Sequence, residues 1–469
     1  MIMKIRMKGA GRRSGALSAL ALSGWCLLAS CQSVTSSLLD VQDPDLIAPL
    51  DVNTADGALS LRNGALNRFR NITGGAESTW LFGGLLADEW STSSTFVQND
   101  ETDQRSIQLN NGSITGFLRN IARTRTASNQ ALKALVQFAP TQTSAIAEMY
   151  FARGFAELQL ASDFCNGIPL SDGSSDPIIY GQPKTVQEVF TVGLASLDSA
   201  LAANSTLTDA ISVSIRNGAR VARARVLLGL NRVPEAAAAV SGIPTSFSYD
   251  HTFATTTGDN TIWAQPLSSR RYTVGDSLEG NARNLLVLNA IPFFSSKDPR
   301  LPVSYTTANA GKDTTKSQDG LTFSRTTTLY ARSTPLPVAN GIDARLIEAE
   351  AALKAGDAPG MLAILNALRA APPKVGEIQP AVMTPLALPA TADAQLNLLF
   401  REKAFWTFSR GQRLGDLRRL IRFYGRTPEN TFPVGQHYRG GNYGLDVNLP
   451  IVTDELNNPN FKGCIDRKA

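Results

Sequence analysis

Apolar residues recur at the spacing of an α-helix over long stretches of this chain. The pattern is clearest at 142–163, where the predicted helix carries apolar stripes on two sides. A helix of this kind is expected to lie between neighbouring helices. The first stripe consists of Ile146, Met149, Ala152, Ala156 and Leu160, and the second of Phe151, Phe155 and Leu158.

The same periodicity predicts helices along most of the chain. One start is marked by Thr185-Val186-Gln187-Glu188, a capping box in which the threonine and glutamate side chains satisfy the free N–H groups of the first turn. A helix should therefore begin at Val186. The remaining predicted helices span 54–71, 78–88, 113–137, 214–230, 233–240, 341–355, 358–370, 392–409 and 415–424.

Two segments have the pattern of tetratricopeptide-type helical hairpins. They lie at 222–240 and 344–365, with alanines where two helices would approach and a short polar turn between them. Residues from about 241 to 338 differ, because they are rich in Thr, Ser, Asn, Gly and Pro and have few helical stripes. Long irregular stretches inside a folded chain are often functional. The sequence thus predicts a mainly α, tetratricopeptide-like scaffold with a large irregular insert.

The first thirty residues predict export. They hold five basic residues and no acidic one, followed by a short apolar run at 16–29. Such a run is too short for a membrane-spanning helix and is typical of a signal peptide. The formal charge of +5 arises in this segment, because 31–469 contain as many acidic as basic residues. A basic surface for nucleic acid is therefore not expected.

Leu28-Ala29-Ser30-Cys31 resembles a bacterial lipobox. Lipid attached to Cys31 would hold the mature chain at a membrane through a tether at 31–53, leaving a folded body at 54–469. The alternative is an ordinary signal peptide that ends in cysteine. If Cys31 is lipidated, Cys165 and Cys464 remain, and export favours a disulfide between them. Two unpaired thiols are the alternative.

Motifs for catalysis or for metal and cofactor binding are missing from the sequence. It holds two histidines, too few for a three-His metal site, and its four cysteines form no CxxC of the kind that zinc ribbons use. Glu348 and Glu350 are two apart on a predicted helix, so they should point to different faces instead of forming a carboxylate pair. We therefore expect neither an enzyme nor a cofactor. The alternative is a pair of distant carboxylates that converge after folding.

The end of the chain holds a cluster of charges with two interpretations. Arg413 and Asp416 are three apart and are expected to pair where a helix starts, and Arg418 and Arg419 follow. These arginines would suit an anion site. A salt-bridged helix start is the favoured interpretation.

The longest motifs resemble those of the SusD/RagB family of outer-membrane nutrient-binding lipoproteins. The resemblance rests on LFREKAFWTFSRGQRLGDLRR at 399–419 and on YGLDVNLPIVTDELNNPNF at 443–461. The segments at 87–89, 147–170 and 344–357 agree in order, so the similarity extends over nearly the whole mature chain. Arg410 stands where the family often has an acidic residue, which puts local pairing in doubt.

This resemblance implies a surface-exposed lipoprotein of the outer membrane. It would bind a nutrient, most often a glycan, and deliver it to a SusC-like TonB-dependent transporter. The alternative is a lipid-anchored helical-repeat scaffold that binds other proteins. Aromatic and polar side chains in two regions are the candidate ligand contacts, with simple packing as the alternative for each aromatic: Trp90, Phe96, Gln98 and Asn99 after the first helices, and Trp263, Arg271 and Tyr272 in the insert.

Overall fold

A computed structural model describes residues 53–279, 285–308 and 313–469. The predicted signal peptide, Cys31 and nearly all of the predicted tether lie outside the described residues. In the part that is described, no helix has the length and apolar character needed to span a membrane.

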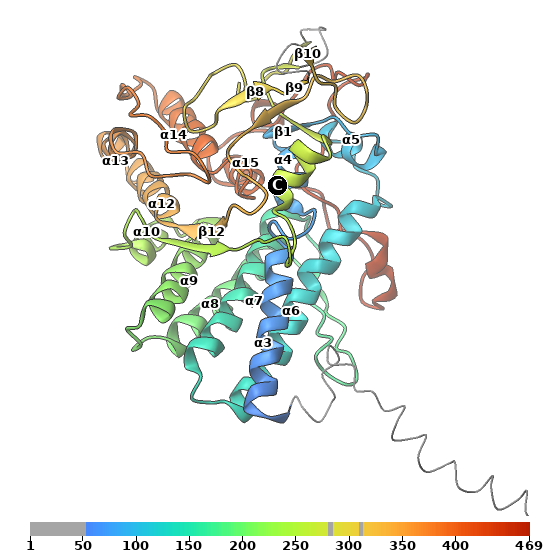
Figure 1. Ribbon diagram of the computed structural model, residues 1–469, viewed down its shortest axis with the longest axis vertical. Coiled ribbons are helices and arrows are strands. Elements are labelled where there is room, and N and C mark those ends of the chain that lie inside the picture. Colours follow the sequence, from blue (N-terminus) through green and yellow to red (C-terminus); the bar gives the residue numbers. More distant parts are fainter. Residues whose placement is uncertain (1–52, 280–284, 309–312) are drawn as a thin grey trace, which may run out of the picture. The chain divides into compact units, whose positions relative to one another are not determined.

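The scaffold consists of helices that pack against their neighbours along the chain. Contacts join α3 to α6, α6 to α7, α7 to α8 and α8 to α9, and Figure 1 shows these helices side by side. The fold is therefore mainly α, as predicted. The bounds are α3 Ala55–Asn71, α4 Thr79–Leu86, α5 Val97–Asp103, α6 Gly112–Phe138, α7 Thr143–Asp163, α8 Val186–Ala203 and α9 Ala210–Gly229.

Local sequence signals set where several helices begin. In α8 the Thr185 hydroxyl accepts from the Glu188 N–H, and the Glu188 carboxylate accepts from the Thr185 N–H at 2.7 Å, which confirms the predicted capping box. Asn340 and Asp343 form a second capping box, at the start of α12. The short α5 was not predicted, because its sequence is polar and carries no apolar stripe.

Both predicted helical hairpins are present. The first is α9 with α10, Val233–Val240, and the second is α12, Gly341–Lys354, with α13, Ala358–Ala370. Because α10 also contacts α12, the two hairpins are stacked on each other although the irregular insert separates them in sequence. The chain continues with α14, Ala392–Trp406, and α15, Arg413–Phe423.

Helix α7 is enclosed as its two apolar stripes predict. It contacts α3, α6, α8 and α9. Phe69 of α3 packs against Phe151 and Phe155 of α7, with ring centroids 5.6 and 5.3 Å apart. On another side α7 approaches α8 so closely that a Cβ on Gly154 would lie 2.7 Å from Leu197, which explains a glycine at this helical position.

The segment between α10 and α12 contains short paired strands and turns. Strand β4 pairs antiparallel with β12, which leads into α12, and β5 pairs with β1, which follows α4. The first pairing joins the two ends of the insert to each other, and the second attaches its interior to the segment after α4. The elements are β1 Trp90–Thr92, β4 Ser248–His251, α11 Thr261–Trp263, the π-helix η2 Ala264–Ser268, β5 Tyr272–Val274, β6 Leu278–Glu279, β7 Leu285–Leu286, β8 Val303–Tyr305, β9 Thr307–Ala308, β10 Asp313–Thr314, β11 Arg325–Thr327 and β12 Leu336–Asn340.

The C-terminal segment returns to the end of α7. The Cys165 N–H donates to the Leu449 carbonyl at 2.9 Å, and the Leu449 N–H donates to the Asp163 carbonyl at 2.8 Å. Close by, Cys165 and Cys464 form a disulfide, as predicted. The bond attaches the tail to the loop that contains β2, Ile168–Pro169, and β3, Pro183–Lys184.

Candidate ligand-binding face and buried charge network

The predicted ligand residues separate into buried and exposed sets. Trp90 is only 1% exposed, its ring packs 5.0 Å from that of Phe408, and its indole N–H donates to the Ser409 hydroxyl at 3.0 Å. Tyr272 and Asn99 are also buried. These three expected ligand residues therefore lie inside the fold and not at its surface. The reason is the β1–β5 pairing, which turns Trp90 and Tyr272 into the core.

Phe96 and Arg271 do lie together at the surface. Phe96 is 44% exposed, and the guanidinium carbon of Arg271 lies 4.5 Å from the centroid of its ring. Gln98 and Trp263 are partly exposed, and Trp263 packs in part against the core. These four residues remain candidates for ligand contact.

A second aromatic group lies on the insert. The rings of Phe294 and Tyr305 are 4.9 Å apart, and those of Tyr305 and Phe323 are 6.3 Å apart. Tyr305 is 44% exposed, while Phe294 and Phe323 are partly exposed. Lysine ammonium groups lie over two of these rings, Lys297 at 3.8 Å from the centroid of Phe294 and Lys316 at 3.5 Å from that of Phe323.

Sequence reasoning did not select this second group as a ligand site. The pairing of β8 with β11 brings these aromatic residues together. It sets Tyr305 opposite Arg325, and Phe323 lies just before β11. The available signal was the presence of aromatics in a polar segment with lysines nearby.

Loops connect the two aromatic groups. The Arg270 guanidinium donates to the Lys316 carbonyl at 3.0 Å, and the Ser94 hydroxyl donates to Gln318 at 3.1 Å. The segment 316–323 thus contacts the loops beside Phe96 and carries Phe323. We call the surface formed by Phe96, Arg271, Phe294, Tyr305, Lys316 and Phe323 the aromatic face.

A buried ion pair lies beside the aromatic face. Arg325 donates to both carboxylate oxygens of Glu279 at 2.7 Å, and its guanidinium carbon lies 5.5 Å from the centroid of Phe294. Burial alone would lower the pKa of Arg325, but the carboxylates of Glu279 and Asp276 raise it above its usual value. Arg325 therefore stays charged beside the ring of Phe294.

The C-terminal charge cluster forms a buried network instead of a local helix start. Arg413 donates to Asp88 at 2.7 Å, so the expected Arg413–Asp416 pair is not formed. Asp416 instead accepts from Lys403 at 3.1 Å and from Arg419. Sequence spacing alone suggested the nearer partner, whereas packing of α15 against α4 brings Arg413 to Asp88.

Arg410, whose local pairing the sequence left open, also has a partner in this network. It donates through both terminal nitrogens to Asp343, at 2.8 and 2.7 Å. Glu350 is buried and accepts from Lys403 and Arg419, and these cations hold its pKa well below its usual value although burial opposes the shift. Glu348 lies on a partly exposed face beside Arg345, which confirms that Glu348 and Glu350 point apart.

Potential metal ligands are not gathered in the described part of the chain. No group of three or more His, Cys, Asp or Glu residues there is arranged to hold a metal ion. His251 is buried beside Thr73, its Nδ1 2.7 Å from the threonine hydroxyl, and burial lowers its pKa to about 3. The exposed aromatic face is the surface that we consider for ligand binding.

No family model matches the sequence. No curated protein resembles it closely enough in sequence to be matched. The similarity lies in the structure.

Helical hairpins joined to an irregular insert define a class that is well represented among solved structures. A SusD superfamily protein from Bacteroides fragilis superposes with a TM-score of 0.62 at 15% identity, covering 87% of this chain and 99% of that one. Another from Bacteroides vulgatus gives 0.60 at 14%, covering 88% and 98%. A laminarin-binding SusD-like protein gives 0.56 at 16%, covering 88% and 99%. The chain has the SusD-like fold.

Proposed function

We propose that this protein binds a glycan on the aromatic face. The observation that carries the proposal is the Phe294–Tyr305–Phe323 group, whose rings are exposed or partly exposed on a segment with many polar side chains. Sugar rings present C–H faces that pack on aromatic rings, and their hydroxyls pair with polar side chains. The fold supports the same ligand class, since one solved structure with this fold is named as laminarin-binding.

We further propose that the protein acts at the outer membrane. Lipid on Cys31 would anchor it, and a SusC-like TonB-dependent transporter would receive the glycan. The predicted lipobox and the SusD-like fold support this role. The chain would then act as a binding protein without catalysis of its own.

Glycan binding is tested by calorimetric titration of a panel that includes laminarin. At least one glycan should bind, and Tyr305→Ala should weaken it about tenfold or more, the equivalent of one lost aromatic contact. The matched control is Tyr180→Ala, because Tyr180 is 48% exposed but lies in the loop near β3. Equal loss in both variants, or no binding by any glycan, would reject the aromatic face.

The transporter proposal is tested by co-purification after mild detergent extraction. Recovery of a large outer-membrane β-barrel protein supports it. Recovery of soluble proteins alone would instead favour the helical-repeat scaffold function, which the stacked α9–α10 and α12–α13 hairpins make a specific second candidate.

A further inference from the structure

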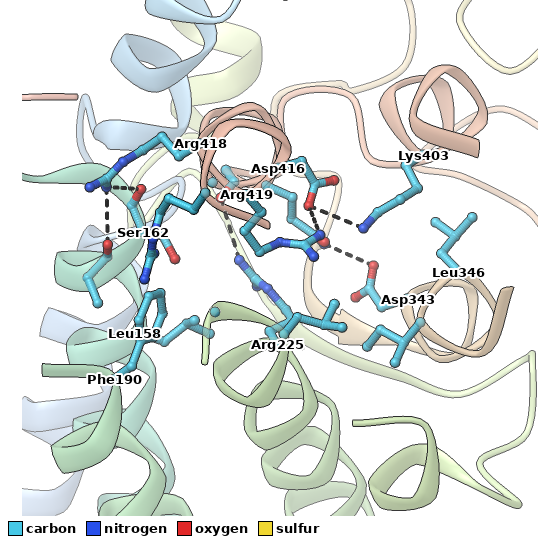
Figure 2. A pocket seen from close by; sticks show the side chains of 18 residues that line it. Leu158, Ser162, Phe190, Arg225, Asp343, Leu346, Lys403, Asp416, Arg418 and Arg419 are labelled. Carbon is cyan, nitrogen blue, oxygen red and sulfur yellow. Dashed lines mark hydrogen bonds and ion pairs between the residues drawn. The ribbon is translucent and has the colours of Figure 1, made fainter. Parts of the chain in front are cut away.

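A small cavity lies inside the scaffold, away from the aromatic face. It is bounded by residues of α7, α8, α9, α12, α14 and α15 and has a volume of about 40 Å³. Figure 2 shows Arg225 extending from α9 toward α15, which contributes Arg418 and Arg419. The lining residues with bearing on its chemistry are Ser162, Arg225, Lys403, Arg418, Arg419 and Arg422.

Two of these arginines have donors without acceptors. Arg418 is 1% exposed, and its Nη1 donates to the carbonyls of Ala161 and Ser162, at 3.1 and 2.5 Å. Its Nε and Nη2 are buried and have no hydrogen-bond partner. Arg225 donates from Nη2 to the Gly411 carbonyl at 3.5 Å, while its Nη1 is buried without a partner.

The neighbouring cations differ, because they are matched by carboxylates. Arg419 and Lys403 both donate to Glu350 and to Asp416. Asp343, on the cavity wall, is held by Arg410. The carboxylates on this side of the cavity, Glu350, Asp416 and Asp343, are therefore already paired with other cations.

Other acids near the unpaired arginines are also occupied. Asp163 lies near Arg418 and Arg225, accepts from Gln159 at 2.5 Å, and has its pKa raised to about 6 by burial. Asp466 accepts from Asn166 at 2.9 Å. Within the described residues, Arg225, Arg418 and Arg422 form no ion pair with a carboxylate.

Guanidinium groups that are buried without a carboxylate partner are costly. Desolvation lowers the pKa of Arg418 to about 9 and that of Arg225 to about 10. The pKa of Arg422 is likewise lowered to about 10, by burial and then by the charge of Arg419. Buried polar groups without partners are uncommon in folded proteins and usually mark an unseen water or ion.

The cavity has room for such an ion. One water needs about 10–15 Å³ by the same measure, so 40 Å³ holds more than one water or a small polyatomic ion. Ser162, Gln412 and Arg422 are partly exposed, which leaves a way in from solvent. Guanidinium groups match oxyanions in both charge and hydrogen-bond geometry.

We propose that this cavity binds one small oxyanion, held by Arg225 and Arg418 and approached by Arg422. The anion would balance the charge of these guanidinium groups and would link α9 to α15 in the middle of the scaffold. It is independent of glycan binding, since none of these residues belongs to the aromatic face.

The test is thermal unfolding of the mature, disulfide-bonded chain with increasing phosphate, sulfate, acetate or chloride at constant ionic strength. Phosphate, sulfate or acetate should raise the Tm in a saturable way, because a ligand that binds only the folded state stabilises it. Response to phosphate and sulfate identifies a tetrahedral ion, and response to acetate a carboxylate. A rise no larger than that in chloride would overturn the proposal.

Substitution of the arginines that line the cavity tests whether a rise in Tm comes from binding at this site. Arg422→Gln is the mild variant, because Arg422 contacts the rings of Phe190 and Phe423 and forms no ion pair among the described residues. It should weaken oxyanion binding about tenfold, the equivalent of one charge-assisted hydrogen bond. Arg418→Lys keeps the charge but loses the planar donors, and should also weaken it.

Arg223→Gln is the matched control. Arg223 lies on the same helix as Arg225, but pairs with the exposed Asp198 at 2.6 Å. Its oxyanion response should equal that of the wild type. If Arg422→Gln and Arg418→Lys, once folded, respond as the wild type does, the site lies elsewhere and the proposal is wrong.

Discussion

At the scale of single residues, burial decides which polar and aromatic groups are available for binding. Trp90 and Phe96 are six positions apart, yet Trp90 lies in the core and Phe96 at the surface. Glu89, beside Trp90, is buried too and accepts the Ser409 N–H at 3.0 Å. Both buried residues should therefore affect stability before they affect any ligand.

Trp90→Ala should destabilise the fold by about 3–5 kcal/mol, as expected when a large buried ring is removed. The measurement is urea unfolding followed by circular dichroism. Phe96→Ala is the control, and since surface substitutions usually change stability by about 0.5 kcal/mol or less, it should unfold near the wild-type midpoint. A small effect of Trp90→Ala on stability would contradict the core position.

Glu89 should make stability depend on pH. Burial raises its pKa to about 8, although Arg413 and the Ser409 N–H oppose the shift. The folded state then holds a proton that the unfolded state releases above about pH 4.5, so this group's contribution is full at low pH and is lost as pH rises toward 8. Glu89→Gln should remove that part of the slope.

The measurement is the free energy of unfolding of wild type and Glu89→Gln between pH 5 and pH 8. The difference should shift in favour of the variant as pH rises. A difference that is constant with pH would show that Glu89 is already ionised in the folded state.

At the scale of elements, contacts between distant segments hold the irregular parts in place. The tail after α15 crosses the end of α7, where Leu449 and the loop after Asp163 exchange backbone hydrogen bonds. The Cys165–Cys464 disulfide closes this contact across a sequence separation of 299 residues. A cross-link over so long a loop restricts the unfolded chain strongly.

Removing the disulfide should lower the free energy of unfolding by about 2–5 kcal/mol. Urea unfolding of the wild type with and without dithiothreitol measures this change. The double variant Cys165→Ser/Cys464→Ser should resemble the reduced wild type and should not respond to dithiothreitol. Peptide mapping without reduction that finds both thiols free would contradict the bond.

At the scale of the whole molecule, the net positive charge is confined to the first thirty residues. The basic excess belongs to the predicted signal peptide, and 31–469 are formally neutral. Within the described body many charges form buried pairs, such as Arg410 with Asp343 and Arg413 with Asp88. Because these charges are buried and paired, they are not available to a ligand at the surface. The aromatic face is therefore a better candidate than the charged network for recognising a weakly charged ligand.

Membrane anchoring is the prediction at this scale. In a lipoprotein-processing bacterial host, the wild type should incorporate labelled palmitate and sediment with membranes. Cys31→Ser should lose both properties, because lipid attachment needs the thiol. The control is Cys26→Ser, which changes a cysteine in the apolar run and should retain them. Label on Cys31→Ser would contradict the predicted site.

The sequence by itself determined the helical part of this protein. Apolar periodicity located the helices, and the Thr185–Glu188 box set the start of α8. Cys165 and Cys464, the two cysteines outside the predicted signal peptide and lipobox, indicated the disulfide. These features succeed because they depend on local backbone bonding or on few alternatives.

Only the tertiary structure decided the partners and the exposed surfaces. It paired Arg413 with Asp88, turned Trp90 and Tyr272 inward, and gathered Phe294, Tyr305 and Phe323 on one face. It also left Arg418 and Arg225 with unpaired donors in a cavity between helices distant in sequence. The physical reason is that burial and pairing are set by packing between segments, which residue spacing along the chain does not specify.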